Sequence, residues 1–185
     1  MEIRKLFILV LAFLWSCSSS ALSWPDKYDW QIRKAVKNYL PTVDWRLYKA
    51  QLIQESSLRP LVVSHAGAKG LAQFMPGTWA DVSSKLQLVG SPFDPHLAIP
   101  AGAFYMSQLR QQWHWKRPER DQHNLALASY NVGLGNMLKA QRLCKMAVLY
   151  EDIARCLQLV PNVNEHETLG YVVRIRRYHT ILKEN

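Results

Sequence analysis

Apolar residues recur at steps of three or four along nearly the whole chain, and the alternation typical of a half-buried strand is almost absent. Tyr28, Ile32, Val36 and Tyr39 follow this helical spacing, while lysines and arginines occupy the positions between them. The 185 residues contain no internal repeat, low-complexity tract or long linker. The pattern predicts one all-α domain of roughly seven to nine helices with no substantial sheet.

Capping residues and prolines predict where these helices begin and end. Pro100 is expected to interrupt a helix or reset its start, because proline removes a backbone donor and clashes with the preceding turn. Later helices are expected over roughly 135–148 and 150–158. The other expected starts are at Asp26, Asp44, Pro76, Asp94, Asp121 and Asn164.

The first 23 residues have the three parts of a secretory signal peptide. Arg4 and Lys5 supply the positive charge, an apolar run extends from Leu6 to Trp15, and small residues precede Trp24. The sequence therefore predicts an exported protein with a mature domain over 24–185. The alternative is a lipoprotein signal that ends before Cys17, with a lipid anchor on that cysteine and an outer-membrane location.

Two cysteines, Cys144 and Cys156, remain after the signal segment. Cysteines of exported proteins tend to pair in an oxidising compartment, so a disulfide between them is predicted. Two buried free thiols are the alternative.

The formal net charge is +9, and removing Arg4, Lys5 and Glu2 with the signal segment leaves +8. A basic exported protein suits anionic polymers of the cell envelope. The basic residues do not form a stripe interleaved with aromatics, which argues against nucleic acid. The histidines and cysteines lack zinc-ligand spacing, so neither a metal nor a cofactor is expected.

Glu55 is the first candidate for chemistry. It follows Leu47, Tyr48, Gln51 and Leu52 at helical spacing, which places its carboxyl group on the mostly apolar side of the last helical turn. Burial and the negative end of the helix dipole both disfavour the anion and raise the pKa of such a group. A carboxylic acid that stays protonated near neutrality suits proton donation. A solvated residue at a frayed helix end is the alternative.

Three later motifs add polar groups near expected turns. Residues 70–78 read GLAQFMPGT, residues 128–133 read ASYNVG, and residues 167–172 read ETLGYV. Amides hydrogen-bond sugar hydroxyl and N-acetyl groups, and methionine supplies an adaptable apolar wall. Taken singly, each motif is equally typical of a core loop, a helix end or a capped helix start.

In this order the four motifs closely resemble those of the soluble lytic transglycosylases, the lysozyme-like enzymes of glycoside hydrolase family twenty-three. The family pattern is Glu-Ser, then Gly-Leu-x-Gln-x-Met-Pro-x-Thr, then Ala-Tyr-Asn-x-Gly, then Glu-Thr-x-x-Tyr-Val. The resemblance covers about residues 40 to 180, and Ser129 in place of alanine is its one departure.

The resemblance implies a lysozyme-like fold and a role for each matching residue. Glu55 would be the single catalytic acid and base, cleaving the bond between N-acetylmuramic acid and N-acetylglucosamine in peptidoglycan glycan strands with formation of a 1,6-anhydro ring. The residues implied for substrate binding are Ser56, Gln73, Met75, Tyr130, Asn131, Glu167 and Tyr171.

Two other functions remain open. A goose-type lysozyme-like hydrolase would use water as acceptor, and Asp81 and Asp94 are the nearby carboxylates that could position it. A non-catalytic peptidoglycan-binding or secretion-scaffold protein is the other. The sequence predicts a monomer located in the periplasm or cell envelope. Its biological setting stays open: it could act in wall turnover, in a secretion or conjugation apparatus, or in a phage.

Overall fold

A computed structural model describes residues 24–184, so the expected signal segment and Cys17 lie outside the described residues. Within 24–184 the chain forms eight α-helices and one 3₁₀ turn, with isolated β-bridges at Val63–Lys69 and Lys69–Phe74 but no strand. The predicted all-α class and helix number are confirmed. The elements are α1 (Asp29–Tyr39), α2 (Trp45–Ser56), α3 (Pro76–Lys85), α4 (Pro95–Gln112), α5 (Glu119–Val132), α6 (Leu134–Leu143), α7 (Tyr150–Ala154), η1 (Leu157–Leu159) and α8 (Glu165–Glu184).

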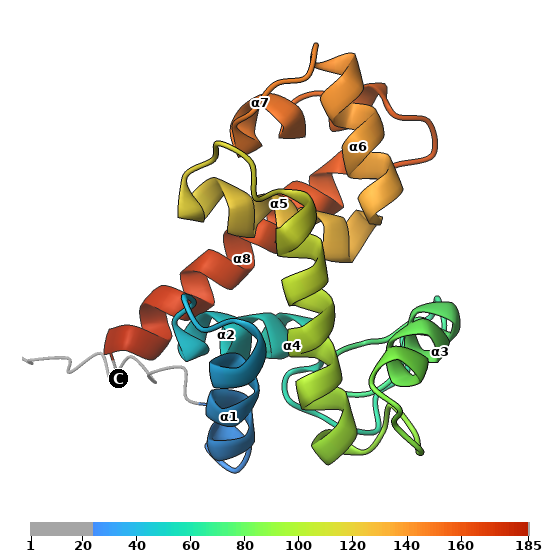
Figure 1. Cartoon of the computed structure of the whole chain (residues 1–185), viewed down its shortest axis with the longest axis vertical. Helices are drawn as coiled ribbons and strands as arrows, with labels where there is room; N and C mark the ends of the chain where they lie inside the picture. The colour runs from blue at the N-terminus through green and yellow to red at the C-terminus, as the bar shows by residue number, and fades with distance from the viewer. Residues whose placement is uncertain (1–23, 185) are drawn as a thin grey trace, which may run out of the picture.

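The long helix α8 connects the two ends of the molecule (Figure 1). It packs along α2, with Tyr171 near Glu55 and His179 near Asp44, and it also packs against α5. Helix α3 lies to one side of α4. Among residues 24–184, none of the helices has the length and apolar character needed to cross a membrane.

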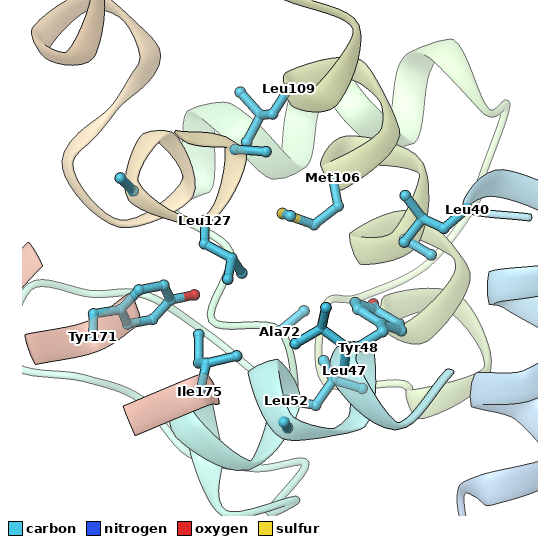
Figure 2. Packing of buried hydrophobic residues seen from close by; sticks show 14 of the residues in the cluster. Leu40, Leu47, Tyr48, Leu52, Ala72, Met106, Leu109, Leu127, Tyr171 and Ile175 are labelled. Carbon is cyan, nitrogen blue, oxygen red and sulfur yellow. The ribbon is translucent and has the colours of Figure 1, made fainter. Parts of the chain in front are cut away.

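One apolar core lies where α2, α4, α5 and α8 meet. Figure 2 shows Tyr48 and Leu52 of α2, Met106 of α4 and Leu127 of α5 converging with Ile175 of α8. All five side chains are at most 1% exposed. The helical spacing of the sequence is therefore the spacing of the faces that meet in this core.

Several predicted details of the helices differ from the structure. Helices α6 and α7 end at Leu143 and Ala154, before the expected ends near residues 148 and 158. Helix α1 begins at Asp29 rather than after Asp26. Helix α5 begins at Glu119, so Asp121 lies in its first turn, where its carboxylate accepts a hydrogen bond from the Tyr150 backbone N–H at 2.9 Å. Helix α4 continues through Pro100. Burial of Ile99 and Ala101, both 0% exposed, stabilises the helix there and offsets the missing hydrogen bond.

The predicted pairing of Cys144 with Cys156 is present, with the two Cα atoms 5.8 Å apart. Cys144 directly follows α6, and Cys156 lies between α7 and η1. The bridge joins two residues 12 positions apart in the sequence and holds α7 against the end of α6.

Candidate active site

Glu55 owes its position to two features of α2. The Asp44 side chain caps the N-terminus by accepting the Arg46 N–H at 3.0 Å, as the sequence predicts. The helix stops at Ser56 because Ser57 and Leu58 both adopt left-handed backbone conformations, with φ of 53° and 58°. Glu55 is thus held in the last turn, half-buried, and burial raises its pKa from 4.5 to about 8.

Tyr171 of α8 reaches this carboxyl group from the opposite wall. Its hydroxyl donates a hydrogen bond to Glu55 Oε1 at 2.5 Å. This bond lowers the pKa of Glu55, against the larger effect of burial. The side chain is 3% exposed, and burial together with the Glu55 charge raises the pKa of Tyr171 well above its usual value. Tyr171 therefore remains a hydrogen-bond donor at any ordinary pH.

Two more tyrosines lie close enough to Glu55 for its charge to affect them. Tyr130 of α5 donates to the Ala72 carbonyl at 2.6 Å, and Tyr48 of α2 donates to the Ile99 carbonyl at 2.7 Å. Burial and then the Glu55 charge raise the pKa of both phenols. Three neutral phenols thus surround the carboxyl group, and none of them supplies a charge that would hold it ionised.

Glu55 opens onto a cleft of about 320 Å³. The residues that line it come from α2, the loop before α3, the end of α5 and the start of α8: Gln54, Glu55, Ser64, Ala66, Ala68, Gln73, Met75, Tyr130, Asn131, Glu167, Tyr171 and Arg174. A larger cavity of about 560 Å³ lies around Arg176, between α5, α7 and α8, but contains none of the predicted site residues. Because Glu55 and most of the other predicted site residues line the smaller cleft, we take it as the candidate active site.

Ser56 is the one predicted site residue that does not line this cleft. It is 3% exposed, and its hydroxyl lies 2.9 Å from the Leu71 carbonyl and 3.2 Å from the Leu52 carbonyl. The residue after Glu55 on a helix points about 100° away, which here is into the core. Ser56 therefore links α2 to the loop before α3 through its hydrogen bond to Leu71.

The loop before α3 is shaped by Gly70 and Gln73. Gly70 has φ of 77°, and a side-chain carbon there would lie 1.9 Å from the Pro92 carbonyl oxygen, so only glycine fits. The Gln73 amide donates to the Gly70 and Val62 carbonyls at 2.8 and 3.2 Å. Both of its donor hydrogens face the loop, and its carbonyl oxygen is the group left for a ligand.

The other predicted residues differ in how firmly they are held. Asn131 accepts a hydrogen bond from the Thr168 hydroxyl at 2.8 Å, which orients its amide. Met75 is 44% exposed just before α3. Glu167 is exposed in the first turn of α8, where its backbone N–H donates to Asn164 at 3.2 Å. Asn131 is preorganised, whereas Met75 and Glu167 are free to adapt.

Five residues that line the cleft were missed from sequence: Gln54, Ser64, Ala66, Ala68 and Arg174. Arg174 donates from Nε to Gln54 Oε1 at 3.0 Å, which links α8 to α2 at the edge of the cleft. Arg174 follows Tyr171 by three residues and Gln54 precedes Glu55 by one. Helical spacing from Tyr171 would have indicated Arg174, since residues three apart share a face.

The motif in α5 departs from the family pattern at Ser129, and the structure shows why a hydroxyl fits there. Ser129 is 0% exposed, accepts the Trp113 indole N–H at 3.0 Å and donates to the Leu125 carbonyl at 2.7 Å. Trp113 is 1% exposed and would otherwise bury an unpaired donor.

Comparison with known proteins assigns the chain to a family. The model of the transglycosylase SLT domain matches residues 32–147, so the chain belongs to this family. It is 30% identical over 171 residues to a membrane-bound lytic murein transglycosylase F of Hahella chejuensis, covering 84% of this chain and 32% of that protein.

Two solved structures have the same fold. An inactive mutant of the lytic transglycosylase Slt of Pseudomonas aeruginosa has a TM-score of 0.67 and 25% identity, covering 85% of this chain and 24% of that one. The 70 kDa soluble lytic transglycosylase of Escherichia coli has a TM-score of 0.64 and 25% identity, with the same two coverages.

The chain spans about a third of the length of the curated relatives it matches and about a quarter of these two structures. The family match ends at residue 147, before α8 begins, so Glu167, Tyr171 and Arg174 lie beyond it. The geometry of the cleft is what connects these three residues with Glu55.

Proposed function

We propose that this chain is a peptidoglycan lytic transglycosylase in which Glu55 is the catalytic acid and base. The observation that carries the proposal is a half-buried carboxyl group, hydrogen-bonded to Tyr171, in a cleft whose lining includes amides, phenols and a methionine, and burial raises the pKa of this group to about 8. Such a group is protonated at neutral pH and ready to donate to a glycosidic oxygen. The family and the lytic murein transglycosylases among its relatives support the same substrate class.

The proposed reaction uses the Glu55 carboxyl group twice, first as an acid and then as a base. Glu55 gives its proton to the oxygen between N-acetylmuramic acid and N-acetylglucosamine, and the bond from C1 to that oxygen breaks. The N-acetyl carbonyl of the muramic acid stabilises the positive C1. The Glu55 carboxylate then takes the proton of the C6 hydroxyl, and O6 bonds to C1. The products are a 1,6-anhydro sugar and a free 4-hydroxyl, no water is consumed, and Glu55 is again protonated.

The surroundings of Glu55 support both of its states. Burial favours the neutral acid that begins the reaction, and the Tyr171 hydrogen bond favours the anion that follows bond cleavage. A pKa near neutrality keeps the free-energy difference between the two states small. One carboxyl group can therefore serve in both half-reactions.

The hydrolase alternative requires a second carboxylate beside the sugar to position water. Neither Asp81 nor Asp94 is among the residues that line the cleft, and Asp94 is engaged in capping α4, where it accepts the His96 N–H at 2.8 Å. Among residues 24–184, the one other carboxylate in this cleft is the exposed Glu167. The positions of Asp81 and Asp94 outside the cleft favour the transglycosylase over the hydrolase.

Mass spectrometry of the soluble products from digested peptidoglycan tests the proposal. A transglycosylase releases fragments that end in anhydro-muramic acid, each lighter by one water than the corresponding hydrolysis product. Reducing muramic acid ends would establish the hydrolase instead. Sacculi that bind the protein and release nothing would identify a binding or scaffold protein.

We also propose that the protein acts in the cell envelope, since its substrate is found there. The sequence of residues 1–23 and the membrane-bound name of the relatives support export. N-terminal sequencing of protein from the envelope fraction should find Trp24 first, or a blocked, lipid-modified Cys17. An intact Met1 on protein from the cytoplasm would contradict export.

A further inference from the structure

Arg174 is the one cationic side chain that lines the cleft within residues 24–184. In that part of the chain it forms no ion pair, and its Nη1 and Nη2 atoms make no hydrogen bond. Glu167 lines the same cleft but precedes Arg174 by seven residues on α8, which is about 10 Å along the helix axis. The proposed acid–base reaction assigns no role to this cation.

Two contacts hold the guanidinium group of Arg174 beside the catalytic carboxyl group. Its Nε donates to Gln54 Oε1 at 3.0 Å, and Gln54 directly precedes Glu55 on α2. Its Nη1 lies over Gly170, where an added side-chain carbon would be only 2.8 Å from that nitrogen. Any larger residue at position 170 would push the guanidinium group aside. The positive charge therefore has a defined place relative to Glu55.

The bond to Gln54 leaves the two terminal amino groups of Arg174 for a ligand. They lie in one plane, and a carboxylate can accept hydrogen bonds from such a pair with both of its oxygens. The charge of Arg174 is not needed to tune the acid, because burial and the Tyr171 hydrogen bond account for the shifted pKa of Glu55. Arg174 is thus arranged to bind an anion on the substrate.

The substrate of the proposed reaction carries such an anion on only one of its two sugars. N-acetylmuramic acid and N-acetylglucosamine both have the C2 N-acetyl group and the C6 hydroxyl on which the reaction depends, so Glu55 chemistry alone does not distinguish the two kinds of bond in the strand. The sugars differ at O3, where muramic acid bears a lactyl arm. Its carboxyl group is free in peptide-free strands and otherwise joined to the stem peptide, which has carboxylates of its own.

We propose that Arg174 is a specificity-determining residue that binds a carboxylate on the lactyl arm and thereby aligns the correct glycosidic bond with Glu55. The proposal rests on the proposed function, since it concerns the substrate of the same cleft. The arm occurs on every second sugar, so a cation at a defined place beside Glu55 favours every second bond. N-acetylglucosamine in the same position would offer Arg174 no charge to bind.

Calorimetric binding to the folded but inactive Glu55→Gln protein tests the proposal without turnover. The probe is a peptide-free tetrasaccharide of alternating N-acetylglucosamine and N-acetylmuramic acid with free lactyl carboxylates. Adding Arg174→Gln should weaken its binding about tenfold, the effect of losing charged hydrogen bonds at an exposed site. The methyl ester of this probe, and a tetrasaccharide of N-acetylglucosamine alone, should bind equally well with and without the Arg174 substitution.

Arg177→Gln in the same Glu55→Gln background is the matched control. Arg177 is exposed on the same helix and does not line the cleft, and its substitution removes the same charge. The control should leave the affinity for all three probes unchanged. If Arg177→Gln weakens binding of the acidic probe as much as Arg174→Gln does, the effect is one of overall charge and the proposal is wrong.

Strands that carry intact stem peptides identify the source of the carboxylate. A loss of affinity confined to peptide-free strands assigns Arg174 to the lactyl carboxylate itself, and a loss on peptide-bearing strands assigns it to a carboxylate of the stem peptide. Binding of both kinds of strand that is unaffected by Arg174→Gln would overturn the proposal. So would an equal loss of affinity for the methyl ester.

The choice of bond is measured on the products of the otherwise wild-type protein. Arg174→Gln should lower kcat/KM for strands with the recognised carboxylate about tenfold, mainly through KM, and should leave some fragments that end in anhydro-N-acetylglucosamine. A fall in kcat alone, with every fragment still ending in anhydro-muramic acid, would contradict the alignment. A wild type inactive on sacculi would defeat the proposed function, and the binding series would still decide whether Arg174 binds the carboxylate.

Discussion

The hydroxyl of Tyr171 donates a 2.5 Å hydrogen bond to Glu55 from a position 116 residues further along the chain. The bond joins the first turns of α8 to the last turn of α2. It gives the buried carboxyl group one partner that supports its anion, in surroundings that otherwise favour the neutral acid.

Replacing Glu55 with glutamine should abolish activity and leave a folded protein that still binds sacculi. Glutamine keeps the shape and can hydrogen-bond, but it cannot donate and then accept the proton. The rate should fall by at least about 10²–10⁴-fold, measured as solubilisation of sacculi. Asp81→Asn and Asp94→Asn should stay within a few-fold of wild type, because neither carboxylate lines the cleft. Activity of Glu55→Gln near the wild-type level would refute the mechanism.

Replacing Tyr171 with phenylalanine should move the upper pH limit of activity upward. Wild-type kcat/KM should fall as pH rises through about 8, where Glu55 loses its proton. Without the hydroxyl that supports the anion, the Glu55 pKa rises further and the limit moves with it. Activity at neutral pH should fall about tenfold, since one hydrogen bond to a charged group is lost. Tyr178→Phe, on the same helix beside Trp24, is the control and should change neither quantity.

The stability of the folded protein should also depend on Glu55. Its pKa is raised from 4.5 to about 8 on folding, so between these values the folded state binds more protons than the unfolded state. Stability contributed by the neutral carboxyl group is present below about pH 4.5 and is lost as pH rises through about 8. Glu55→Gln should therefore exceed wild type in unfolding free energy at pH 9 by about 2 kcal/mol, a figure reduced for the partial exposure of the group.

Urea unfolding of both proteins at pH 4 and pH 9 measures this difference, and the other titrating groups cancel in the comparison. A difference that is the same at both pH values would show that Glu55 has no raised pKa in the folded protein.

Replacing Ser129 with alanine should destabilise the protein by about 1–3 kcal/mol, because the buried Trp113 indole N–H loses its acceptor. Alanine is smaller than serine and is the usual residue of the family pattern, so the fold should remain. Ser107→Ala, which removes a half-buried hydroxyl bonded to the Phe104 carbonyl, should cost less. Chemical denaturation of the two variants gives the comparison, and equal losses would contradict a special role for the indole contact.

Replacing Cys144 and Cys156 together with serine should cost about 2–3 kcal/mol of unfolding free energy, as expected for a short enclosed segment. The cleft lies on other elements, so specific activity below the unfolding transition should remain near wild type. Thiol titration of unfolded, unreduced wild-type protein should find no free thiol in protein made in an oxidising compartment. Two free thiols there would contradict the pairing.

The sequence was sufficient for the fold class and for the neighbourhood of Glu55, because both rest on helical spacing. The Asp44 cap and the apolar face of α2 place Glu55 without any distant contact. Pro100 shows where local rules fail, since helix α4 continues through it only because tertiary burial stabilises both sides. Asp121 is a residue type that often caps helices. Here, however, it accepts a hydrogen bond from the backbone N–H of Tyr150, 29 positions away, and no local sequence pattern predicts that contact.

Ser56 shows the same limit at the cleft. The family resemblance implied that Ser56 would bind the substrate, yet one step along a helix points its side chain about 100° away from that of Glu55, into the core. The partners of a residue across the core depend on packing, which spacing alone does not specify.

The interval of 116 residues between Glu55 and Tyr171 determines when, during synthesis, the cleft can be completed. A chain made from its N-terminus presents Glu55 early, as an ordinary ionised side chain in water. The tyrosine wall of the cleft is complete only after α8 has been synthesised and has docked on α2. Under the proposed mechanism, a nascent or truncated chain that lacks α8 has an ionised Glu55 and an incomplete cleft, and it should be inactive until the last helix has docked.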